Sequence, residues 1–196
     1  MVSAATSKKS DTSTKKYKKY KMFRQADKRW RKQKYGTGRL SGSGCGPTSI
    51  AILVSSFNDK ITPKDTGKWL ASKGYAHKGT KWAGIAAGLK HFGFSGVTKH
   101  SSKACYKKSG TSAEKSWRSK MRTKKYVGIL NMGNSKGHKP VWTTGGHYIA
   151  IVDYKKSGGT EYYYVLDPGS RHNDGWFKWS AFSGYVRNFW SCKSKV

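Results

Sequence analysis

Cys45 is the residue whose type and neighbours best suit a nucleophile. It lies between Gly44 and Gly46, directly before a run of apolar residues at helical spacing. A helix N-terminus presents free N–H groups and a partial positive charge, which stabilise a thiolate relative to the thiol. The two glycines would let a substrate backbone approach the sulfur closely. We therefore expect Cys45 to be a reactive thiolate; the alternative is a small buried residue at a helix start.

A thiolate nucleophile needs an acid–base partner, and the partner needs an orienting group. His147 is the best placed of the six histidines, because it opens a strand-like run directly after Gly146. Asp167 closes the next strand-like run, and the turn between the two runs is centred near Gly158. In a hairpin with that centre, the numbers of two paired residues sum to about 316, so His147 lies opposite residue 169. Asp167 is two residues away from residue 169 and is therefore the diagonal neighbour of His147 on the same face of the sheet.

Diagonal neighbours lie about 7–8 Å apart at the backbone, which is within reach of an Asp–imidazole hydrogen bond. Asp153 is the rival orienter, but it lies six residues further along the strand, about 20 Å from His147 at roughly 3.3 Å per residue. The sequence therefore predicts the set Cys45, His147 and Asp167.

Acyl transfer also needs hydrogen-bond donors for the oxyanion. The backbone N–H of Cys45 would be one donor, and Gln25, 20 residues earlier in the chain, is the candidate for the second. An ordinary surface glutamine is the alternative. We expect Gly44, Gly46 and Gly146 to leave room for the substrate backbone close to Cys45. Trp142, in the loop before His147, is expected to line the cleft, although tryptophan in this half of the chain is more typical of sheet core.

Two further cysteines, Cys105 and Cys192, could form one disulfide or remain as two buried free thiols, and their spacing does not decide between these alternatives. A zinc site that combines cysteines with His91, His100 or His172 lacks the usual ligand spacing. We therefore expect neither a metal nor another cofactor.

The first half of the chain has helical periodicity. After Pro47, which suits a first helical turn, Ile50, Leu53, Val54 and Phe57 recur at i, i+3, i+4 and i+7. Further helices are predicted from Thr62, as an N-cap, to residue 74, over 82–93, and over 112–123 with Ser112 as the cap.

The second half changes to strand-like runs rich in β-branched and aromatic residues, at 126–132, 147–154, 162–167, 176–179 and 185–190. Helices followed by strands indicate an α+β fold in which N-terminal helices pack on a C-terminal antiparallel β-sheet.

The chain is strongly basic throughout. It has 196 residues and a formal net charge of +31, with 35% hydrophobic and 14% aromatic residues. Enough apolar residues are present for a core, no apolar run is long enough to span a bilayer, and no signal peptide is visible. Residues 1–21, rich in lysine, serine and threonine, are expected to be a disordered basic tail, and residues 22–196 the catalytic domain. That domain keeps most of the positive charge.

These segments together resemble a known family. Gln25-Ala26-Asp27 with Trp30, Gly44 to Ser49, Gly146 to Ile151, and Leu166-Asp167-Pro168 are similar to papain-like cysteine peptidases of the bacteriocin-processing (double-glycine leader peptidase) type. The closest likeness is to the stand-alone branch without a transporter domain. The resemblance implies a papain-like fold, Cys45 as nucleophile, His147 as general base, Asp167 as orienter and Gln25 as oxyanion donor. The lysine-rich surface is not a family feature.

The charge calls for an anionic partner, which could be nucleic acid, anionic lipid or the polyanionic bacterial wall. No nucleic-acid-binding signature is visible. We expect a monomeric peptidoglycan hydrolase, an amidase or endopeptidase of the endolysin or lytic-effector type, that acts extracellularly or in the cell wall. One alternative is a protease for a protein or propeptide. Another is a non-catalytic basic module that binds wall polymer or nucleic acid.

Overall fold

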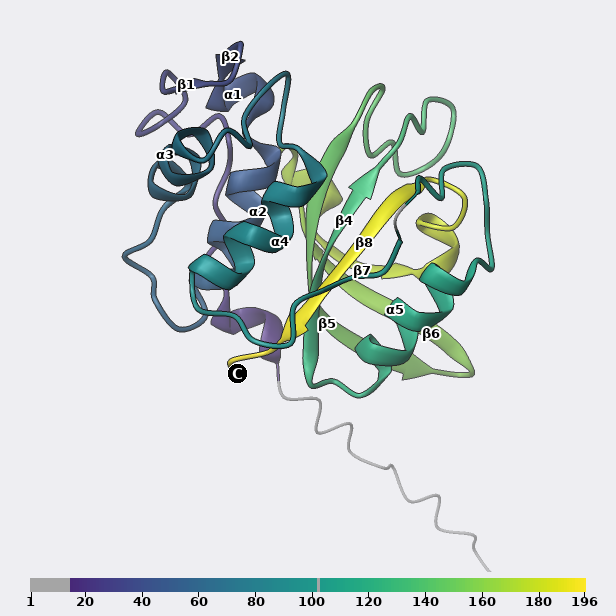
Figure 1. Cartoon of the computed structure of the whole chain (residues 1–196). Helices are drawn as coiled ribbons and strands as arrows, with labels where there is room; N and C mark the ends of the chain where they lie inside the picture. The colour runs from purple at the N-terminus through teal and green to yellow at the C-terminus, as the bar shows by residue number, and fades with distance from the viewer. Residues whose placement is uncertain (1–14, 102) are drawn as a thin grey trace, which may run out of the picture.

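An antiparallel six-stranded sheet with helices on both faces forms the centre of the molecule (Figure 1). The computed structural model describes residues 15–101 and 103–196. The sheet order is β3-β8-β4-β5-β6-β7, and a separate two-stranded sheet joins β1 and β2. The strands are β1 (Lys34–Tyr35), β2 (Gly38–Arg39), β3 (Thr98–Lys99), β4 (Tyr126–Met132), β5 (His147–Ser157), β6 (Thr160–Leu166), β7 (Gly175–Lys178) and β8 (Val186–Lys193).

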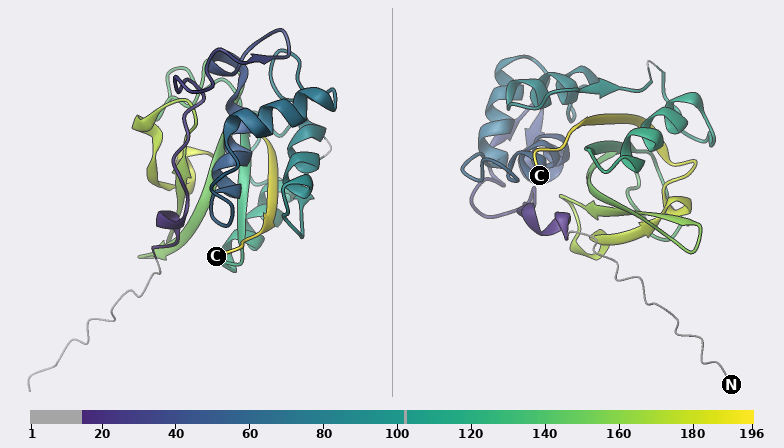
Figure 2. Two further views of the ribbon diagram at one scale, coloured as in Figure 1. Left: turned by 90° about the vertical axis from the view of Figure 1, so that its left-hand side faces the viewer. Right: turned by 90° about the horizontal axis from the view of Figure 1, so that it is seen from below.

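The helices divide into two layers. The α-helices are α1 (Leu40–Ser43), α2 (Cys45–Val54), α3 (Pro63–Ser72), α4 (Trp82–His91) and α5 (Ser112–Arg122), and short 3-10 turns lie at Lys16–Lys19, Arg171–Asn173 and Trp179–Ala181. Seen from below, α2 to α4 and α5 lie on opposite sides of the sheet (Figure 2). The α+β prediction, with helices before an antiparallel sheet, is therefore confirmed. In addition, Phe177 of β7 and the last 3-10 turn pack on the α5 side.

Two cores follow from this layering, because alternate residues of each strand point to opposite faces of the sheet. Tyr148 and Ala150 of β5 join the core under α2 to α4, whereas Ile149 and Ile151 join the core under α5. Helix α2 is buried along its whole length, as expected for a helix that is apolar on every side. Its predicted end was wrong: α2 stops at Val54, and Phe57 lies beyond it, 42% exposed.

Local sequence signals account for the other helix starts. The predicted cap of α3 is confirmed, since Thr62 and Asp65 form a reciprocal capping box in which the Asp65 carboxylate accepts a hydrogen bond from the Thr62 N–H at 2.9 Å. In α5 the cap is Thr111, whose hydroxyl accepts from the Glu114 N–H, one residue before the predicted Ser112. Within the described residues, no helix is both long enough and apolar enough to cross a bilayer.

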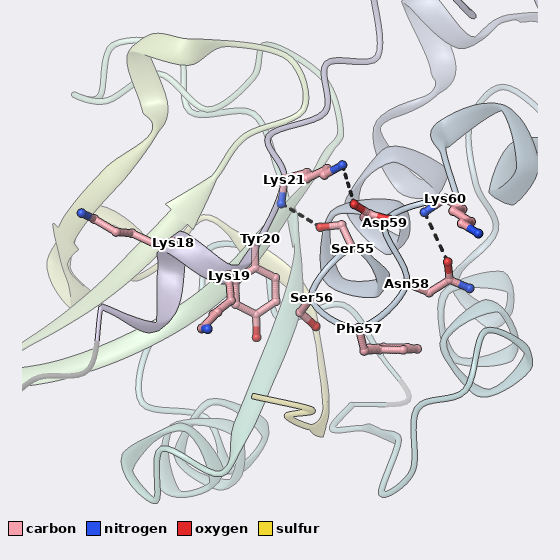
Figure 3. A pocket seen from close by; sticks show the side chains of 10 residues that line it. All are labelled: Lys18, Lys19, Tyr20, Lys21, Ser55, Ser56, Phe57, Asn58, Asp59 and Lys60. Carbon is pink, nitrogen blue, oxygen red and sulfur yellow. Dashed lines mark hydrogen bonds and ion pairs between the residues drawn. The ribbon is translucent and has the colours of Figure 1, made fainter.

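The predicted tail boundary at residue 21 needs correction. Lys16–Lys19 form a 3-10 turn, Tyr20 is buried, and the Tyr17 ring stacks on Tyr164 with centroids 4.1 Å apart. Figure 3 shows how this segment lies against the end of α2, where the Lys21 N–H donates to Ser55 Oγ at 2.8 Å. The packing of Tyr17 and the burial of Tyr20 hold this segment against the domain although the segment is rich in lysine. The domain therefore includes residues 15–21. The rest of the predicted tail lies outside the described residues.

Replacing Tyr20 by alanine tests this revised boundary. We expect the free energy of unfolding to fall by about 3 kcal/mol, because a large buried ring is lost and a cavity remains. Urea unfolding followed by circular dichroism measures the effect, and Lys19→Ala, which changes an exposed neighbour, is the matched control. If Tyr20→Ala and Lys19→Ala had equal stabilities, residues 15–21 would belong to the tail and not to the folded domain.

Candidate active site

Cys45 is the first residue of α2 and is 8% exposed. Helix α1 leads directly into α2 through Gly44, whose N–H donates to the Leu40 carbonyl at 2.9 Å. This junction places the thiol at the helix N-terminus, where the free N–H groups favour an anion. The local arrangement that the sequence predicted around Cys45 is therefore present in the structure.

His147 connects the thiol to Asp167. Its Nε2 hydrogen-bonds Asp167 Oδ1 at 2.6 Å, and the influence of the imidazole lowers the pKa of the Cys45 thiol. The hydrogen bond predicted from the strand register is thus observed. Because Nε2 is engaged by the carboxylate, Nδ1 is the ring nitrogen left for proton exchange at the sulfur.

The carboxylate of Asp167 is held from several directions. Oδ1 also accepts from the backbone N–H of Gly169 at 2.7 Å, and Oδ2 accepts from Asn173 Nδ2 at 3.0 Å. The Asp167 backbone is fixed as well, because its N–H donates to Asp174 and its carbonyl accepts from Arg24. With the side chain 1% exposed, this carboxylate has little freedom to leave the imidazole. The rival Asp153 lies near the far end of β5 and bonds the backbone N–H of Tyr154.

The electrostatics of the three groups favour a thiolate–imidazolium pair. Burial raises the pKa of the Cys45 thiol, but hydrogen bonding to His147 and the charge of the imidazole outweigh it, so the pKa lies below the ordinary value. Burial lowers the pKa of His147, yet hydrogen bonds to Asp167 and Cys45 raise it on balance. Burial also raises the pKa of Asp167, and hydrogen bonding to His147 outweighs it and leaves the pKa lowered. Such a pair is a ready nucleophile near neutral pH.

Gln25 lies between the Asp167 turn and the helix that precedes Cys45. Its backbone N–H donates to the Pro168 carbonyl at 2.9 Å, and its Nε2 donates to the Ser41 carbonyl at 2.8 Å. The amide nitrogen carries a second hydrogen, which the Ser41 bond does not use. Gln25 therefore lies against α1 and the turn after Asp167, and its role as an oxyanion donor stays a prediction.

The expected substrate-binding residues divide into two groups. Gly146 lines a cavity beside Cys45. The close approaches at the other two glycines are made by the protein itself: a Cβ on Gly44 would lie 2.4 Å from the Leu40 carbonyl oxygen, and one on Gly46 would lie 2.2 Å from Thr80 Oγ1. These glycines are needed for internal packing, and their expected role in admitting a substrate backbone stays a prediction.

Trp142 does not line the cleft. It is 4% exposed, its ring stacks on Phe182 with centroids 5.1 Å apart, and its Nε1 donates to the Ala181 carbonyl. Trp142 therefore belongs to the core, which was the alternative that the sequence left open for it. The remaining cysteines, Cys105 and Cys192, are both buried and free, one in each core, so the disulfide alternative is excluded in this structure.

Two parts of the site were not predicted from the sequence. One is the side chain that donates a hydrogen bond to Asp167 Oδ2, and the other is a group of residues that line the cavity beside Cys45. Asn173 lies in a polar loop with no periodicity to mark it. Asn131, Trp82 and Arg187 come from three separate elements and meet only in the fold. Only the proximity of Asn173 to Asp167 along the chain could have drawn attention to it.

Comparison with known proteins identifies one family whose model covers most of the chain. The model of the Peptidase C39-like family matches residues 17–194. A crystal structure described as that of a C39-like peptidase from Bacillus anthracis is similar to 89% of this chain and 94% of its own, with 11% sequence identity and a TM-score of 0.48. A search of the curated proteins found no match.

Proposed function

Because the chain belongs to the Peptidase C39-like family, a family of cysteine peptidases, we propose that it hydrolyses amide bonds with Cys45 as nucleophile, His147 as acid and base, and Asp167 as the group that orients His147. The hydrogen bond between His147 and Asp167 and the lowered pKa of the Cys45 thiol support these roles.

Acylation begins when the Cys45 thiolate attacks the carbonyl carbon of the substrate amide. The carbon–oxygen π electrons move to oxygen, and the backbone N–H of Cys45 and the side-chain amide of Gln25 are the proposed donors to this oxyanion. As the intermediate collapses, His147 Nδ1 gives its proton to the departing nitrogen. The carbon–nitrogen bond breaks, and an amine and a thioester on Cys45 result.

Deacylation uses the same groups in reverse. His147 accepts a proton from water, the resulting hydroxide attacks the thioester carbon, and the carbon–sulfur bond breaks. A carboxylic acid leaves, and the thiolate–imidazolium pair is restored. Asp167 keeps the imidazole in the tautomer and orientation that serve the sulfur in both steps.

The distribution of charge supports peptidoglycan as the substrate. Every side-chain carboxylate in the described residues already accepts a hydrogen bond or forms an ion pair within the protein; these are Asp27, Asp59, Asp65, Glu114, Asp153, Glu161, Asp167 and Asp174. In the same part of the chain the lysines and arginines that form ion pairs are Lys21, Arg24, Arg29, Arg118 and Arg122. The remaining lysines and arginines of residues 15–101 and 103–196 form no ion pair with a carboxylate.

Peptidoglycan contains amide bonds and lies within polyanionic wall polymer. A surface of unpaired cations concentrates a protein in such a matrix by long-range attraction. The single observation that carries the wall assignment is therefore the uncompensated positive charge of the whole catalytic domain. The proposed place of action is the bacterial cell wall, with an amidase or endopeptidase activity.

Purified bacterial walls test this assignment. We expect the protein to reduce the turbidity of a wall suspension, and the rate to fall severalfold when salt is raised from about 0.05 to about 0.5 M, because the Debye length shortens to a few ångströms. Walls stripped of their anionic polymer are the control, in which the salt dependence should weaken. Mass spectrometry of the released fragments identifies the new amine and carboxyl ends.

Two other outcomes would contradict the wall assignment in different ways. Cleavage of unfolded protein without clearing of any wall type would indicate a protease for protein or propeptide substrates. No cleavage at all, together with an inert Cys45 thiol near pH 6, would indicate a binding module that keeps the fold.

A further inference from the structure

A cavity of about 370 Å³ opens beside Cys45. The loop between Ala76 and Trp82 contributes Lys78 and Lys81 to its lining, and Gly146 and Arg187 line it as well. The loop is tied to the site by two hydrogen bonds: Tyr148 donates to the Thr80 carbonyl at 2.8 Å, and the hydroxyls of Tyr35 and Thr80 bond at 2.7 Å. The cavity is therefore a fixed neighbour of the candidate nucleophile.

The charge of this cavity has one sign. Lys78, Lys81 and Arg187 line it together with His77, and no carboxylate is among its lining residues. Lys78 and Lys81 are exposed, and Arg187 is half-buried. A substrate group that enters this space meets the ammonium groups of two exposed lysines, which form its rim, and the guanidinium of a half-buried arginine.

Arg187 differs from the other half-buried arginines near carboxylates. Arg24 is paired with Asp174, and Arg118 with Glu114 and Glu161. In the described part of the chain, the side chain of Arg187 makes neither an ion pair nor a hydrogen bond. The guanidinium lies near the Tyr106 ring, whose centroid is 5.5 Å from Cζ, and near two glycines, Gly133 and Gly146.

Gly146 gives the guanidinium its place. A Cβ on Gly146 would lie 3.1 Å from the nearer terminal nitrogen of Arg187, so the fork lies against the residue that precedes His147. A guanidinium that is partly withdrawn from water beside an aromatic ring, without a carboxylate, has lost hydration without gaining an ionic partner. Its planar fork matches a carboxylate with two parallel hydrogen bonds.

We propose that this cavity binds a free carboxylate of the substrate, next to the scissile amide, through Arg187 with Lys78 and Lys81 at the rim. The inference rests on the proposed function and names the substrate class more narrowly: amides whose neighbouring residue carries a carboxylate, as the stem peptides of peptidoglycan do. Arg187 is the residue that determines this specificity.

Alkylation of Cys45 by two matched reagents tests the inference. Iodoacetate and iodoacetamide react in the same way, with the sulfur forming a bond to the CH₂ carbon as iodide leaves, but only iodoacetate carries a carboxylate. The rate with iodoacetate is divided by the rate with iodoacetamide, first for Cys45 and then for N-acetylcysteine. The first ratio divided by the second is the normalised ratio, which measures how strongly the site prefers a reagent with a carboxylate. The measurement at about 0.15 M salt screens remote charges beyond about 8 Å.

The decisive comparison is between variants, because the His147 imidazolium also attracts iodoacetate. We expect Arg187→Gln to lower the normalised ratio roughly three- to tenfold, as the loss of one nearby charge implies, and Arg187→Lys to restore part of it. Lys78→Gln combined with Lys81→Gln, on an exposed loop, should lower it also. Lys115→Gln, which removes one exposed charge from α5, should leave it unchanged. A ratio in Arg187→Gln equal to that of Lys115→Gln would overturn the inference.

A binding measurement keeps this test separate from the proposed activity. The Cys45→Ala protein is titrated calorimetrically with a stem peptide that has a free α-carboxyl on its γ-linked glutamate, and with the same peptide amidated there. We expect the free carboxylate to bind roughly three- to tenfold more tightly, and Arg187→Gln to remove the difference. An all-L acidic peptide as a third ligand distinguishes a wall peptide from a protein segment. Equal affinities for the free and amidated peptides would contradict the inference even if walls are cleaved.

Discussion

Replacing Cys45 by alanine is expected to lower the rate of wall solubilisation at least about 10⁴-fold, because removal of a catalytic nucleophile leaves only binding and oxyanion stabilisation. Initial turbidity rates at several enzyme concentrations measure the loss. The substitution removes a single sulfur atom from a buried position, so the thermal midpoint from circular dichroism should change little.

Cys105→Ala is the matched control for this variant, since it also removes a buried free thiol. Cys105 bonds weakly to Ser101 and Lys103 and lies in the other core. We expect it to keep its activity. Full activity of Cys45→Ala, or an equal loss in both cysteine variants, would remove Cys45 from the role of nucleophile.

Asp167→Asn should have the second largest effect, a loss of about 10²- to 10⁴-fold in kcat. The carboxylate stabilises the imidazolium of His147, and the imidazolium in turn keeps the pKa of the Cys45 thiol low. An amide cannot supply the negative charge, so the pKa of His147 falls and the pKa of Cys45 rises. The thiolate fraction at a given pH therefore decreases.

The pH dependence of Cys45 alkylation by iodoacetamide reads this change directly, without any substrate. We expect the wild-type protein to react readily near pH 6, and the rate profile of Asp167→Asn to move to higher pH. At a fixed pH below the thiol pKa, the rate falls about tenfold each time that pKa rises by about one. Cys192, whose pKa is raised by burial, should remain unmodified in both proteins.

Asp153→Asn is the control for Asp167→Asn, because Asp153 is a second buried carboxylate, near the far end of the same β5 strand. Burial raises the pKa of Asp153, and the cations that act on this carboxylate are Lys16 and Lys124, not His147. An unchanged alkylation profile in Asp167→Asn, or the same shift in Asp153→Asn, would show that Asp167 does not tune the thiol.

Much of the fold follows from short-range patterns. The capping residues Thr62 and Asp65 fix the start of α3, and Gly158 and Gly159, both with positive φ, form a two-residue turn between β5 and β6 where a turn centred near Gly158 was predicted. These features depend on residues a few positions apart, so the sequence predicts them well. The same locality explains why the environment of Cys45 was predictable, since the helix N-terminus is formed by its immediate neighbours.

Predictions about exposure were less successful, because burial depends on distant segments. Trp142 was expected in the cleft and packs on Phe182 instead. Residues 15–21 were expected in a tail, yet Tyr17 stacks on Tyr164, far along the chain. Neither contact leaves a periodic signal in the local sequence.

The pairing of His147 with Asp167 depends both on short-range sequence patterns and on the tertiary structure. Next to the turn, Ser157 pairs with Thr160, so paired residue numbers there sum to 317 and not to the predicted 316. A continuous ladder of that register would put His147 and Asp167 on opposite faces of the sheet. A β-bulge between Ile151 and Asp153 inserts one extra residue in β5, and beyond it Ile151 pairs with Val165 in the register that joins the two side chains.

The sequence by itself determined which residues are chemically suited to the site: the cysteine at a helix start, the histidine at a strand start and the aspartate after the next strand. Only the tertiary structure decided that the histidine and the aspartate share a face, that Asn173 and Arg24 hold the Asp167 segment, and that Arg187 lines the same cavity as Cys45 without an acidic partner among the described residues. The physical reason is that helix caps and turns form through neighbouring residues, whereas a bulge, a buried ring and a cavity wall form where segments far apart in the chain pack together.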